Sequence, residues 1–232
     1  MNFFSQYPRF FSTSKTSAGS ERLNRRYDVL IRKNADLIRN RHILDIASHD
    51  GRWTFAAVKA GAAHVTGIEV RQHLVSNAEK TFAHYGIPSN RYSFLCGDVF
   101  EAAGNLTAVF DTVFCFGFFY HTLRHAELLM LINRFRASVL IIDTKIIPSS
   151  VAEASFHLLR EPANDEGNGS ILSGAVTDEA IVGVPTLGAV ITLLDYFGYG
   201  VEVVDWTNYL GEDLTDLADY AKGERTTIIG RR

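Results

Sequence analysis

The residues best placed to do chemistry in this chain are three acids that follow predicted strands. Asp45, Glu69 and Asp98 each stand at or just past the end of an apolar stretch that is typical of a buried strand. Ligands of open parallel sheets bind beyond the carboxyl ends of the strands, so these acids should meet around one crevice. Glu69 lies about twenty residues past a small-residue turn, where an acid can accept hydrogen bonds from both hydroxyls of a ribose. The sequence therefore predicts a site for an adenosine-bearing cofactor.

The turn over residues 47–51 reads Ala-Ser-His-Asp-Gly and separates a predicted strand from a predicted helix. Small residues are expected in such a turn because a bound cofactor must approach the backbone closely. The amide groups at the start of the following helix can hold a carboxylate or a phosphate. We expect this turn to cup the cofactor.

Candidates for acid–base chemistry stand just past a predicted strand over residues 109–114. His121 is our candidate for the general base that takes a proton from an acceptor, because histidine titrates near neutral pH. The alternative is that His121 caps the next helix or orients a loop. Its neighbour Tyr120 either lines the acceptor pocket or packs in the core.

Asp143 ends another predicted strand and is a third catalytic candidate, which could orient the acceptor. It could also hold a divalent ion together with Asp165 and Glu166, since such ions prefer oxygen ligands. Acids so far apart in the sequence are a weak metal signal, and loop acids are more often simply solvated. The sequence holds no CxxC or HExxH pattern, so zinc is not expected.

The elements that must position these residues alternate between strand and helix. Strands are predicted over 42–46, 64–69, 92–96, 109–114, 138–143, 201–204 and 226–229, and helices over 21–40, 52–60, 71–85, 126–135 and 187–197. This alternation predicts a parallel sheet with helices on both faces. Residues 147–186 break the pattern with many Pro, Gly, Ser and Asn residues, and they are predicted to be a substrate-covering insertion of loops and short elements.

We predict that residues 1–40 form an N-terminal lid or helical segment and that residues 41–232 form the cofactor-binding domain. The first segment is rich in aromatic residues, which are hard to bury in the sheet itself; they are Phe3, Phe4, Tyr7, Phe10 and Phe11. We expect them to fold over the cofactor as a lid or to pack on a second subunit, which would make the protein a homodimer. The alternative is a disordered tail.

Composition narrows the class of protein. The 232 residues are 47% hydrophobic, which is enough for one large α/β domain with a substantial core. The formal net charge of −3 provides no global positive field, so nucleic acid is not an expected partner. No apolar run is long enough to span a bilayer. The two cysteines both fall in predicted strands, which favours a reducing, cytoplasmic setting.

Four short motifs carry a family resemblance. An acid followed by small residues at alternate positions stands at 45–51, where Ala47 and His49 take two positions that are usually Gly and Gly51 keeps the third. Further motifs are Gly-Ile-Glu-Val at 67–70, Gly-Asp-Val at 97–99 and Phe-Asp-Thr-Val-Phe-Cys at 110–115. In these motifs the chain resembles the class I S-adenosylmethionine-dependent methyltransferases.

The resemblance implies a Rossmann-like, three-layer α/β/α sandwich with a seven-stranded, mostly parallel sheet and an antiparallel C-terminal edge strand. It implies S-adenosylmethionine as the methyl donor, with Glu69 on the ribose and Asp98 near the adenine amino group. The cofactor-binding residues that it implies are Asp45, Ala47, Ser48, His49, Gly51, Glu69, Val70, Asp98, Val99, Cys115 and Phe116. Some sugar O-methyltransferases use magnesium, which makes Mg²⁺ a possible second cofactor.

The function that the resemblance implies is methyl transfer to a small-molecule acceptor, above all to a hydroxyl of a sugar or a secondary metabolite. A tRNA-modifying methyltransferase is one alternative, because residues 110–121 are similar to tRNA wobble-uridine carboxymethyltransferases, which carry a Tyr-His pair after the fourth strand. The chain lacks the long N-terminal domain of those enzymes. A non-catalytic domain that holds the adenosyl cofactor is a further alternative, favoured by the residues at positions 47 and 49.

Overall fold

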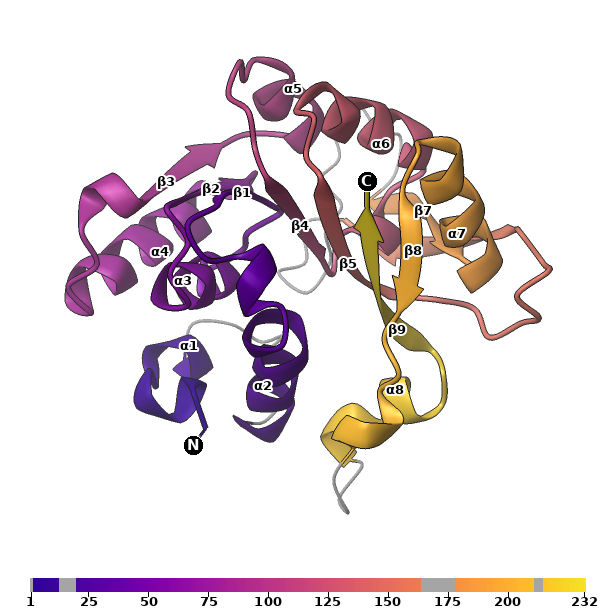
Figure 1. The fold of residues 1–232 in the computed structure, drawn as a ribbon, viewed down its shortest axis with the longest axis horizontal. Helices are drawn as coiled ribbons and strands as arrows, with labels where there is room; N and C mark the ends of the chain where they lie inside the picture. Colours follow the sequence, from indigo (N-terminus) through magenta and orange to yellow (C-terminus); the bar gives the residue numbers. More distant parts are fainter. Residues whose placement is uncertain (1, 13–19, 164–177, 211–214) are drawn as a thin grey trace. The chain divides into compact units, whose positions relative to one another are not determined.

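A computed structural model of the protein describes residues 2–12, 20–163, 178–210 and 215–232. Seven strands form one sheet in the order β3-β2-β1-β4-β5-β9-β8 (Figure 1). The strands are β1 (His42–Ile46), β2 (His64–Glu69), β3 (Tyr92–Cys96), β4 (Thr112–Phe116), β5 (Val139–Lys145), β8 (Gly200–Val203) and β9 (Arg225–Arg231). The first three run parallel, whereas β9 runs antiparallel to both of its neighbours, β5 and β8. The predicted fold class, a mostly parallel Rossmann-like sheet with an antiparallel C-terminal strand, is confirmed.

Helices follow most of the strands, as the alternating sequence pattern predicted. They are α1 (Arg9–Ser12), α2 (Ser20–Tyr27), α3 (Arg52–Lys59), α4 (Gln72–His84), α5 (Val99–Gly104), α6 (His125–Arg134), α7 (Leu187–Tyr196) and α8 (Ala218–Ala221). Short 3-10 turns occur between them, of which η5 (Phe119–His121) matters most for the chemistry. Among the residues that the structure places, none of the helices has the length and apolar character needed to cross a membrane.

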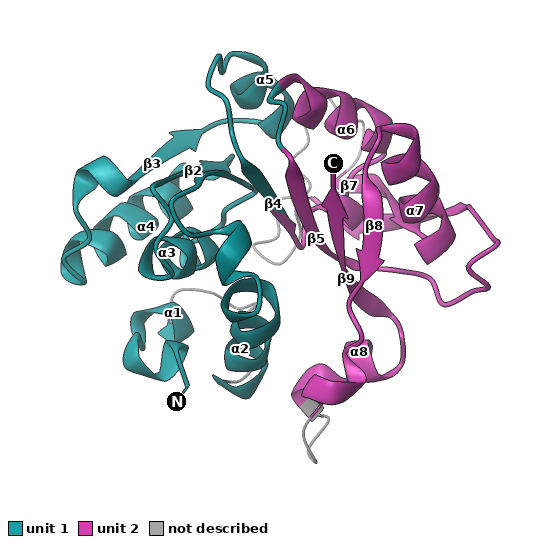
Figure 2. Cartoon of the chain, viewed as in Figure 1, with its two compact units in different colours: residues 1–114, 135–137 teal, residues 115–134, 138–232 magenta. Residues whose placement is uncertain are grey.

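The chain divides into two compact units (Figure 2). Unit 1 comprises residues 1–114 and 135–137, and unit 2 comprises residues 115–134 and 138–232. The division falls within β4, so the chain passes from one unit to the other inside a strand. Unit 1 includes both the predicted N-terminal segment and the first three strands, whereas unit 2 holds β5, β8 and β9.

The N-terminal aromatic residues form part of the core of unit 1. Phe4 and Phe10 are fully buried. The ring of Phe4 meets Trp53 edge to face at 5.7 Å, and Tyr7 and Phe10 lie 4.7 and 5.1 Å from the ring of Phe55. Trp53 and Phe55 belong to α3, the helix that follows the cofactor turn. The N-terminal segment therefore packs against α3. The role of this segment as a lid over the cofactor stays a prediction.

The prediction of one continuous helix over 21–40 is wrong. After α2 the backbone widens into a π-helical turn, Asp28–Arg32, and a 3-10 turn follows at Ala35–Leu37. The side-chain amide of buried Asn34 donates to the carbonyl oxygens of Val29 and Leu30. Because the side chain takes carbonyl oxygens that a continuing helix would use, a regular α-helix does not resume after this turn.

The predicted start of the fourth strand is also wrong. We expected the strand to begin at Val109, but Val109 is exposed and β4 begins at Thr112. Asp111 instead makes two hydrogen bonds to His42, the first residue of β1. Its carboxylate accepts a hydrogen bond from the backbone N–H of His42, and its own backbone N–H donates to the carbonyl oxygen of His42. Residues 109–111 are therefore a connection, and the strand runs on to Phe116.

The insertion over residues 147–186 contains more regular structure than predicted. Two seven-residue strands, β6 (Phe156–Pro162) and β7 (Glu179–Pro185), pair antiparallel as a separate two-stranded sheet. β6 is largely exposed, whereas the second half of β7 is buried. The many Pro, Gly, Ser and Asn residues around the two strands explain why the pattern resembled a loop.

Candidate functional site

In unit 1, the three predicted cofactor acids come together at one edge of the sheet. The pairing registers place Asp45 opposite Gly67 on β2, and Glu69 opposite Cys96 on β3. Asp98 lies two positions after the end of β3 and is the N-cap of α5. The carboxyl ends of the three neighbouring strands are thus aligned, which is the arrangement that binds ligands in open α/β sheets.

Asp45 is a buried carboxyl group with a hydroxyl partner. Its side chain accepts a hydrogen bond of 2.6 Å from Thr54 Oγ1 on α3. Burial raises the pKa of Asp45 to about 7, and the nearby charges of Glu69 and Asp50 add to this effect, although the bond from Thr54 opposes it. Near neutral pH this carboxyl group therefore carries a proton for much of the time.

The turn over residues 47–51 has left-handed backbone at alternate positions. The φ angles of Ala47, His49 and Gly51 are 54°, 55° and 74°. In the methyltransferase motif that residues 45–51 resemble, these three positions usually carry glycine. This chain therefore keeps the left-handed backbone of the motif although two of the three glycines are replaced. For a residue with a Cβ atom, left-handed backbone costs roughly 1–2 kcal/mol, and the turn therefore stores strain.

Close packing beneath the turn explains why two glycines are kept. A Cβ atom on Gly51 would come within 2.8 Å of the Phe94 ring, and one on Gly67 would come within 2.7 Å of Ser48 Oγ. Both distances are shorter than side chains tolerate. The turn therefore rests directly on β2 and on an aromatic ring of β3.

The start of α3 is held by a buried ion pair. Arg52 donates from Nε and Nη2 to the two carboxylate oxygens of Asp50, at 2.8 and 2.7 Å. Burial alone would raise the pKa of Asp50, but the charge of Arg52 and the nearby His49 lower it well below its usual range. The Asp50 side chain is therefore ionised.

Glu69 ties the turn to the end of β2. One of its oxygens accepts from the backbone N–H of His49 and the other from the backbone N–H of Arg71, each at 3.0 Å. A carboxylate has about four lone-pair sites, so these bonds leave capacity for hydroxyl donors. The side chain is buried and oriented by the backbone, which suits the predicted grip on a ribose.

The end of β3 is arranged more openly. The Asp98 carboxylate caps α5 by accepting from the backbone N–H groups of Phe100 and Glu101. Val99, the first residue of that helix, is buried, and Val70 lies after Glu69 with its carbonyl accepting from the Cys96 thiol. These residues occupy the positions predicted for the adenine end of the cofactor.

Several polar atoms of the turn lack a protein partner. Ser48 Oγ and both ring nitrogens of His49 are buried and make no hydrogen bond to the residues that the structure describes. His49 Nδ1 lies 3.7 Å from Asp50 Oδ1, which is beyond hydrogen-bonding range. Buried polar atoms of this kind are normally satisfied by a ligand or by water. The turn therefore fits a cofactor that carries polar groups of its own.

In unit 2, His121 pairs with an acid that the sequence did not single out. His121 Nδ1 lies 2.6 Å from Glu161 Oε2, and both side chains are largely buried. Glu161 comes from β6, 40 positions further along the chain. A carboxylate at Nδ1 holds the proton there, which makes Nε2 the basic nitrogen of the neutral ring. Nothing in the local sequence around Glu161 could have revealed this pairing.

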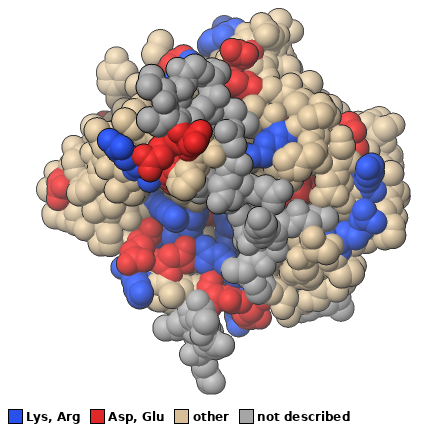
Figure 3. All heavy atoms as spheres, turned by 180° about the vertical axis from the view of Figure 1, so that it is seen from behind, with Lys and Arg blue, Asp and Glu red and all other residues tan. Residues whose placement is uncertain are grey.

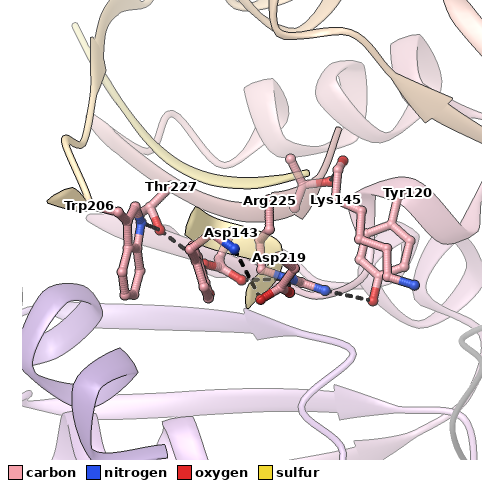
Figure 4. Close-up of polar contacts among 9 residues, drawn as sticks. Tyr120, Asp143, Lys145, Trp206, Asp219, Arg225 and Thr227 are labelled. Atoms are coloured by element: carbon pink, nitrogen blue, oxygen red, sulfur yellow. Dashed lines mark hydrogen bonds and ion pairs between the residues drawn. The ribbon is translucent and has the colours of Figure 1, made fainter. Parts of the chain in front are cut away.

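Asp143 lies at the centre of a buried polar cluster in unit 2 (Figure 4). Its oxygens accept from Arg225 Nη1 at 2.9 Å, Tyr220 Oη at 2.7 Å and Thr227 Oγ1 at 2.9 Å. Burial opposes the charge of Arg225, but the adjacent Asp143 raises the pKa of the guanidinium well above its ordinary value. Arg225 Nη2 also donates to Tyr120 Oη at 3.2 Å, so the cluster reaches the residue next to His121.

Comparison with known proteins identifies the domain. Residues 43–140 match the family described as "Methyltransferase domain". This match spans β1 to the start of β5, which includes the turn, Glu69 and Asp98. Residues 43–140 therefore form a methyltransferase domain. The resemblance seen in the motifs is confirmed.

Solved structures share the fold of this methyltransferase domain. The N-terminal domain of EvdMO1 with SAH bound has a TM-score of 0.63 at 19% identity, covering 88% of this chain and 80% of its own. An S-adenosylmethionine-dependent methyltransferase from Mesorhizobium loti has a TM-score of 0.61 at 13% identity, covering 90% and 98%. The [4+2]-cyclase SpnF has a TM-score of 0.61 at 15% identity, covering 100% and 93%. At such identities the likeness establishes the fold.

One curated relative matches part of the methyltransferase domain. The ribosomal RNA large subunit methyltransferase K/L of Psychrobacter cryohalolentis is 31% identical over 81 residues, which is 34% of this chain. The matched part covers 10% of the length of that relative.

The remaining predicted site residues of the methyltransferase domain lie in different surroundings. Cys115 and Phe116 are buried in β4, and their contact with the cofactor stays a prediction. Asp143 is engaged by the cluster described above, and Asp165 and Glu166 lie outside the described residues. Among the residues that the structure places, no group of three or more His, Cys, Asp or Glu side chains could hold a metal ion. The geometry therefore favours a structural ion pair for Asp143.

Proposed function

We propose that this protein transfers a methyl group from S-adenosylmethionine to a hydroxyl group of a small-molecule acceptor. The donor, when bound, supplies a methyl group on a sulfonium centre to a nucleophile. The chain must hold the donor, place the acceptor and take the hydroxyl proton. The single observation that carries the proposal is the pairing of His121 with Glu161.

The donor side of the proposal rests on the edge of unit 1. The Glu69 carboxylate is oriented by two backbone N–H groups and is suited to accept from ribose hydroxyls. Ser48 and His49 offer buried polar atoms at the left-handed turn. Asp45 holds the start of α3 through Thr54, so that the amides of the turn keep their direction.

The acceptor side rests on acid–base chemistry. A hydroxyl is a poor nucleophile until its proton is removed, so its methylation benefits from a positioned base. Glu161 orients the imidazole of His121 and stabilises the charge that forms when Nε2 takes the proton. A neutral amine needs such a base much less, which is why the His–Glu pair favours oxygen as the methylated atom.

Charge supports a small molecule over nucleic acid as the acceptor. The formal net charge is −3. On the face drawn in Figure 3, basic and acidic side chains of the described residues lie interspersed. Tight binding to RNA depends on many lysine and arginine contacts with phosphates. We also propose a reducing, cytoplasmic setting, in keeping with the thiol form of Cys96 and Cys115.

The solved structures with a similar fold guide the choice of acceptors to test and of the product to detect. One EvdMO1 structure was determined in the presence of SAH and D-fucose, so sugars belong in the panel of acceptors. SpnF is a [4+2]-cyclase, so the shared fold does not determine the reaction. The assay must therefore detect the transferred methyl group itself.

The test combines methyl transfer with donor binding. Purified protein is incubated with S-adenosylmethionine and a panel of sugars, phenols and amines, and the products are detected by their mass. For a hydroxyl acceptor, His121→Ala should lower kcat by about 10²–10⁴-fold, and Glu161→Gln should lower it less and shift the pH profile. Calorimetry should show the same affinity for the donor in both variants, because neither residue belongs to the donor edge.

A matched control is His73→Ala, which removes an exposed histidine on α4. This variant should keep full activity. Full activity of His121→Ala on a hydroxyl acceptor would overturn the assignment of the base. Tight donor binding with no transfer to any acceptor would favour a non-catalytic domain, and salt-sensitive binding of tRNA would favour RNA modification.

A further inference from the structure

Unit 2 contains a cavity of about 380 Å³ where β5 and β8 end and β9 begins. Both β5 and β8 run antiparallel to β9, so their carboxyl ends lie at the same edge of the sheet. The volume is at the lower end of the range for small-molecule sites, which is about 300–1,000 Å³. Six of the residues that line it carry the argument; they are Leu187, Asp205, Trp206, Tyr220, Arg225 and Thr226.

The charges around this cavity disfavour an anionic ligand. Among the described residues of the lining, Arg225 is the cation, and it already pairs with Asp143 at 2.9 Å and with Asp219 at 2.8 Å. Asp205 adds a third carboxylate, and hydrogen bonds from Thr207 lower its pKa, so it is ionised at neutral pH. An anion would therefore meet a guanidinium that is already neutralised and a further negative charge.

The polar groups of the cavity are suited to hydroxyl groups. The Asp205 carboxylate can accept hydrogen bonds, and the hydroxyl of Thr226 can accept or donate one. Leu187 and Trp206 provide the apolar part of the wall. Trp206 is held in place, because its ring stacks on Tyr220 at 3.7 Å and its indole N–H donates to Thr227. A rigid pocket that combines apolar wall with a few polar groups recognises a compact ring with hydroxyl substituents.

The cavity is connected to the proposed base through one side chain. Arg225, in the cavity wall, donates to Tyr120 Oη, and its guanidinium lies 5.2 Å from the centre of the Tyr120 ring. The ring of Tyr120 in turn lies 4.0 Å from that of His121. Figure 4 shows Tyr120 and Arg225 directed toward one another. Arg225 and Tyr120 therefore link the wall of the cavity to the proposed base.

We propose that this cavity holds the part of the acceptor that is not methylated, and that this part is a neutral, hydroxylated ring such as a pyranoside. The proposal rests on the methyl transfer proposed above and adds the class of substrate and the place where it binds.

The experiment measures binding without the donor. The chain has two tryptophans, Trp53 and Trp206, so Trp53→Phe leaves Trp206 as the fluorescent reporter in the cavity wall. Three probes of similar size are titrated: methyl β-D-glucopyranoside as a neutral ring, benzoate as an anion and benzylamine as a cation. We expect a saturable emission change with the glucoside at concentrations at least tenfold below those needed for either charged probe.

A cavity-filling variant provides the second measurement. Leu187→Phe should weaken binding of the glucoside at least tenfold, whereas Met130→Phe, at an exposed position of α6, should leave it unchanged. Thermal unfolding of both variants shows that they are folded. Tighter binding of a charged probe, no saturable change with the glucoside, or unchanged glucoside binding in Leu187→Phe would overturn the proposal.

Failure of this proposal and failure of the proposed function give different results. Methyl transfer with an unchanged KM in Leu187→Phe would reject the cavity as the acceptor site and keep the reaction. Glucoside binding that Leu187→Phe removes, together with no transfer to any hydroxyl, would keep the ligand class of the cavity and reject the reaction.

Discussion

Each unit buries an aspartate near the carboxyl end of a parallel strand, and the two carboxyl groups have opposite partners. Asp45 of unit 1 bonds to the hydroxyl of Thr54, nine positions away, and burial raises its pKa to about 7. Asp143 of unit 2 pairs with the guanidinium of Arg225, 82 positions away. Burial alone thus does not determine whether a strand-end acid is charged, because the partner decides it.

The same difference separates the two regions as a whole. The donor edge of unit 1 is built from neighbouring segments of the chain. Its polar groups bond to the backbone, to nearby hydroxyls and, in the Asp50–Arg52 ion pair, to a side chain two positions away. The cluster of unit 2 is built from residues that are far apart in the sequence, and it is held by ion pairs. Unit 2 should therefore be the more sensitive of the two to the loss of a single charged side chain.

The largest effect is expected from Asp143→Ala. Removing this carboxylate leaves Arg225 buried without its main counter-charge, which typically costs about 3–5 kcal/mol. Urea unfolding followed by circular dichroism measures the loss. Lys222→Ala, at an exposed position just after α8, should change the free energy of unfolding by less than about 0.5 kcal/mol. Equal effects of the two substitutions would contradict the central role of the Asp143–Arg225 pair.

A second effect is expected in the pH dependence of stability. The pKa of Asp45 is about 7 in the folded protein, against 3.8 for an ordinary aspartate. Between these values the folded state binds a proton that the unfolded state releases. The stabilising contribution of this group is therefore complete below about pH 4 and is lost as the pH rises through about 7.

Asp45→Asn tests this prediction, because asparagine keeps an acceptor for Thr54 and does not titrate. Over pH 4–7 the free energy of unfolding of the variant should fall less than that of the wild type, by on the order of 3 kcal/mol. Urea titrations at several pH values provide the comparison, with Asp36→Asn, at a position outside the buried core, as the control. Parallel pH curves for wild type and Asp45→Asn would show that Asp45 is ionised in the folded protein.

The smallest effect is expected at the strained turn. Ala47→Gly relieves left-handed strain of roughly 1–2 kcal/mol but adds freedom to the unfolded chain worth about 0.5–1 kcal/mol. A net gain of up to about 1.5 kcal/mol should follow and should appear as a higher urea midpoint. Ala60→Gly, at a right-handed position with φ of −77°, should instead lose stability. A loss at position 47 as large as that at position 60 would mean that the turn is not strained.

The elements of unit 1 could be predicted closely, because their signals are local. The bounds of β1, β2 and β3 agree with the predicted strands, and α3 and α4 differ by one residue at the ends. The helix after residue 20 and the start of β4 could not be predicted in this way. Asn34 acts there through side-chain hydrogen bonds to the preceding turn, and Asp111 through one to the start of β1, and these bonds override the apolar pattern.

The sequence by itself determined the order of strands and helices, the small-residue turn and the acids at the strand ends, since these follow from apolar spacing and residue type over short stretches. Only the tertiary structure decided that Glu161 orients His121 and that Arg225 neutralises Asp143. The physical reason is that contacts between distant residues depend on how strands pair and which side chains become buried together. A carboxylate or an imidazole in the sequence looks the same whichever partner the fold brings to it.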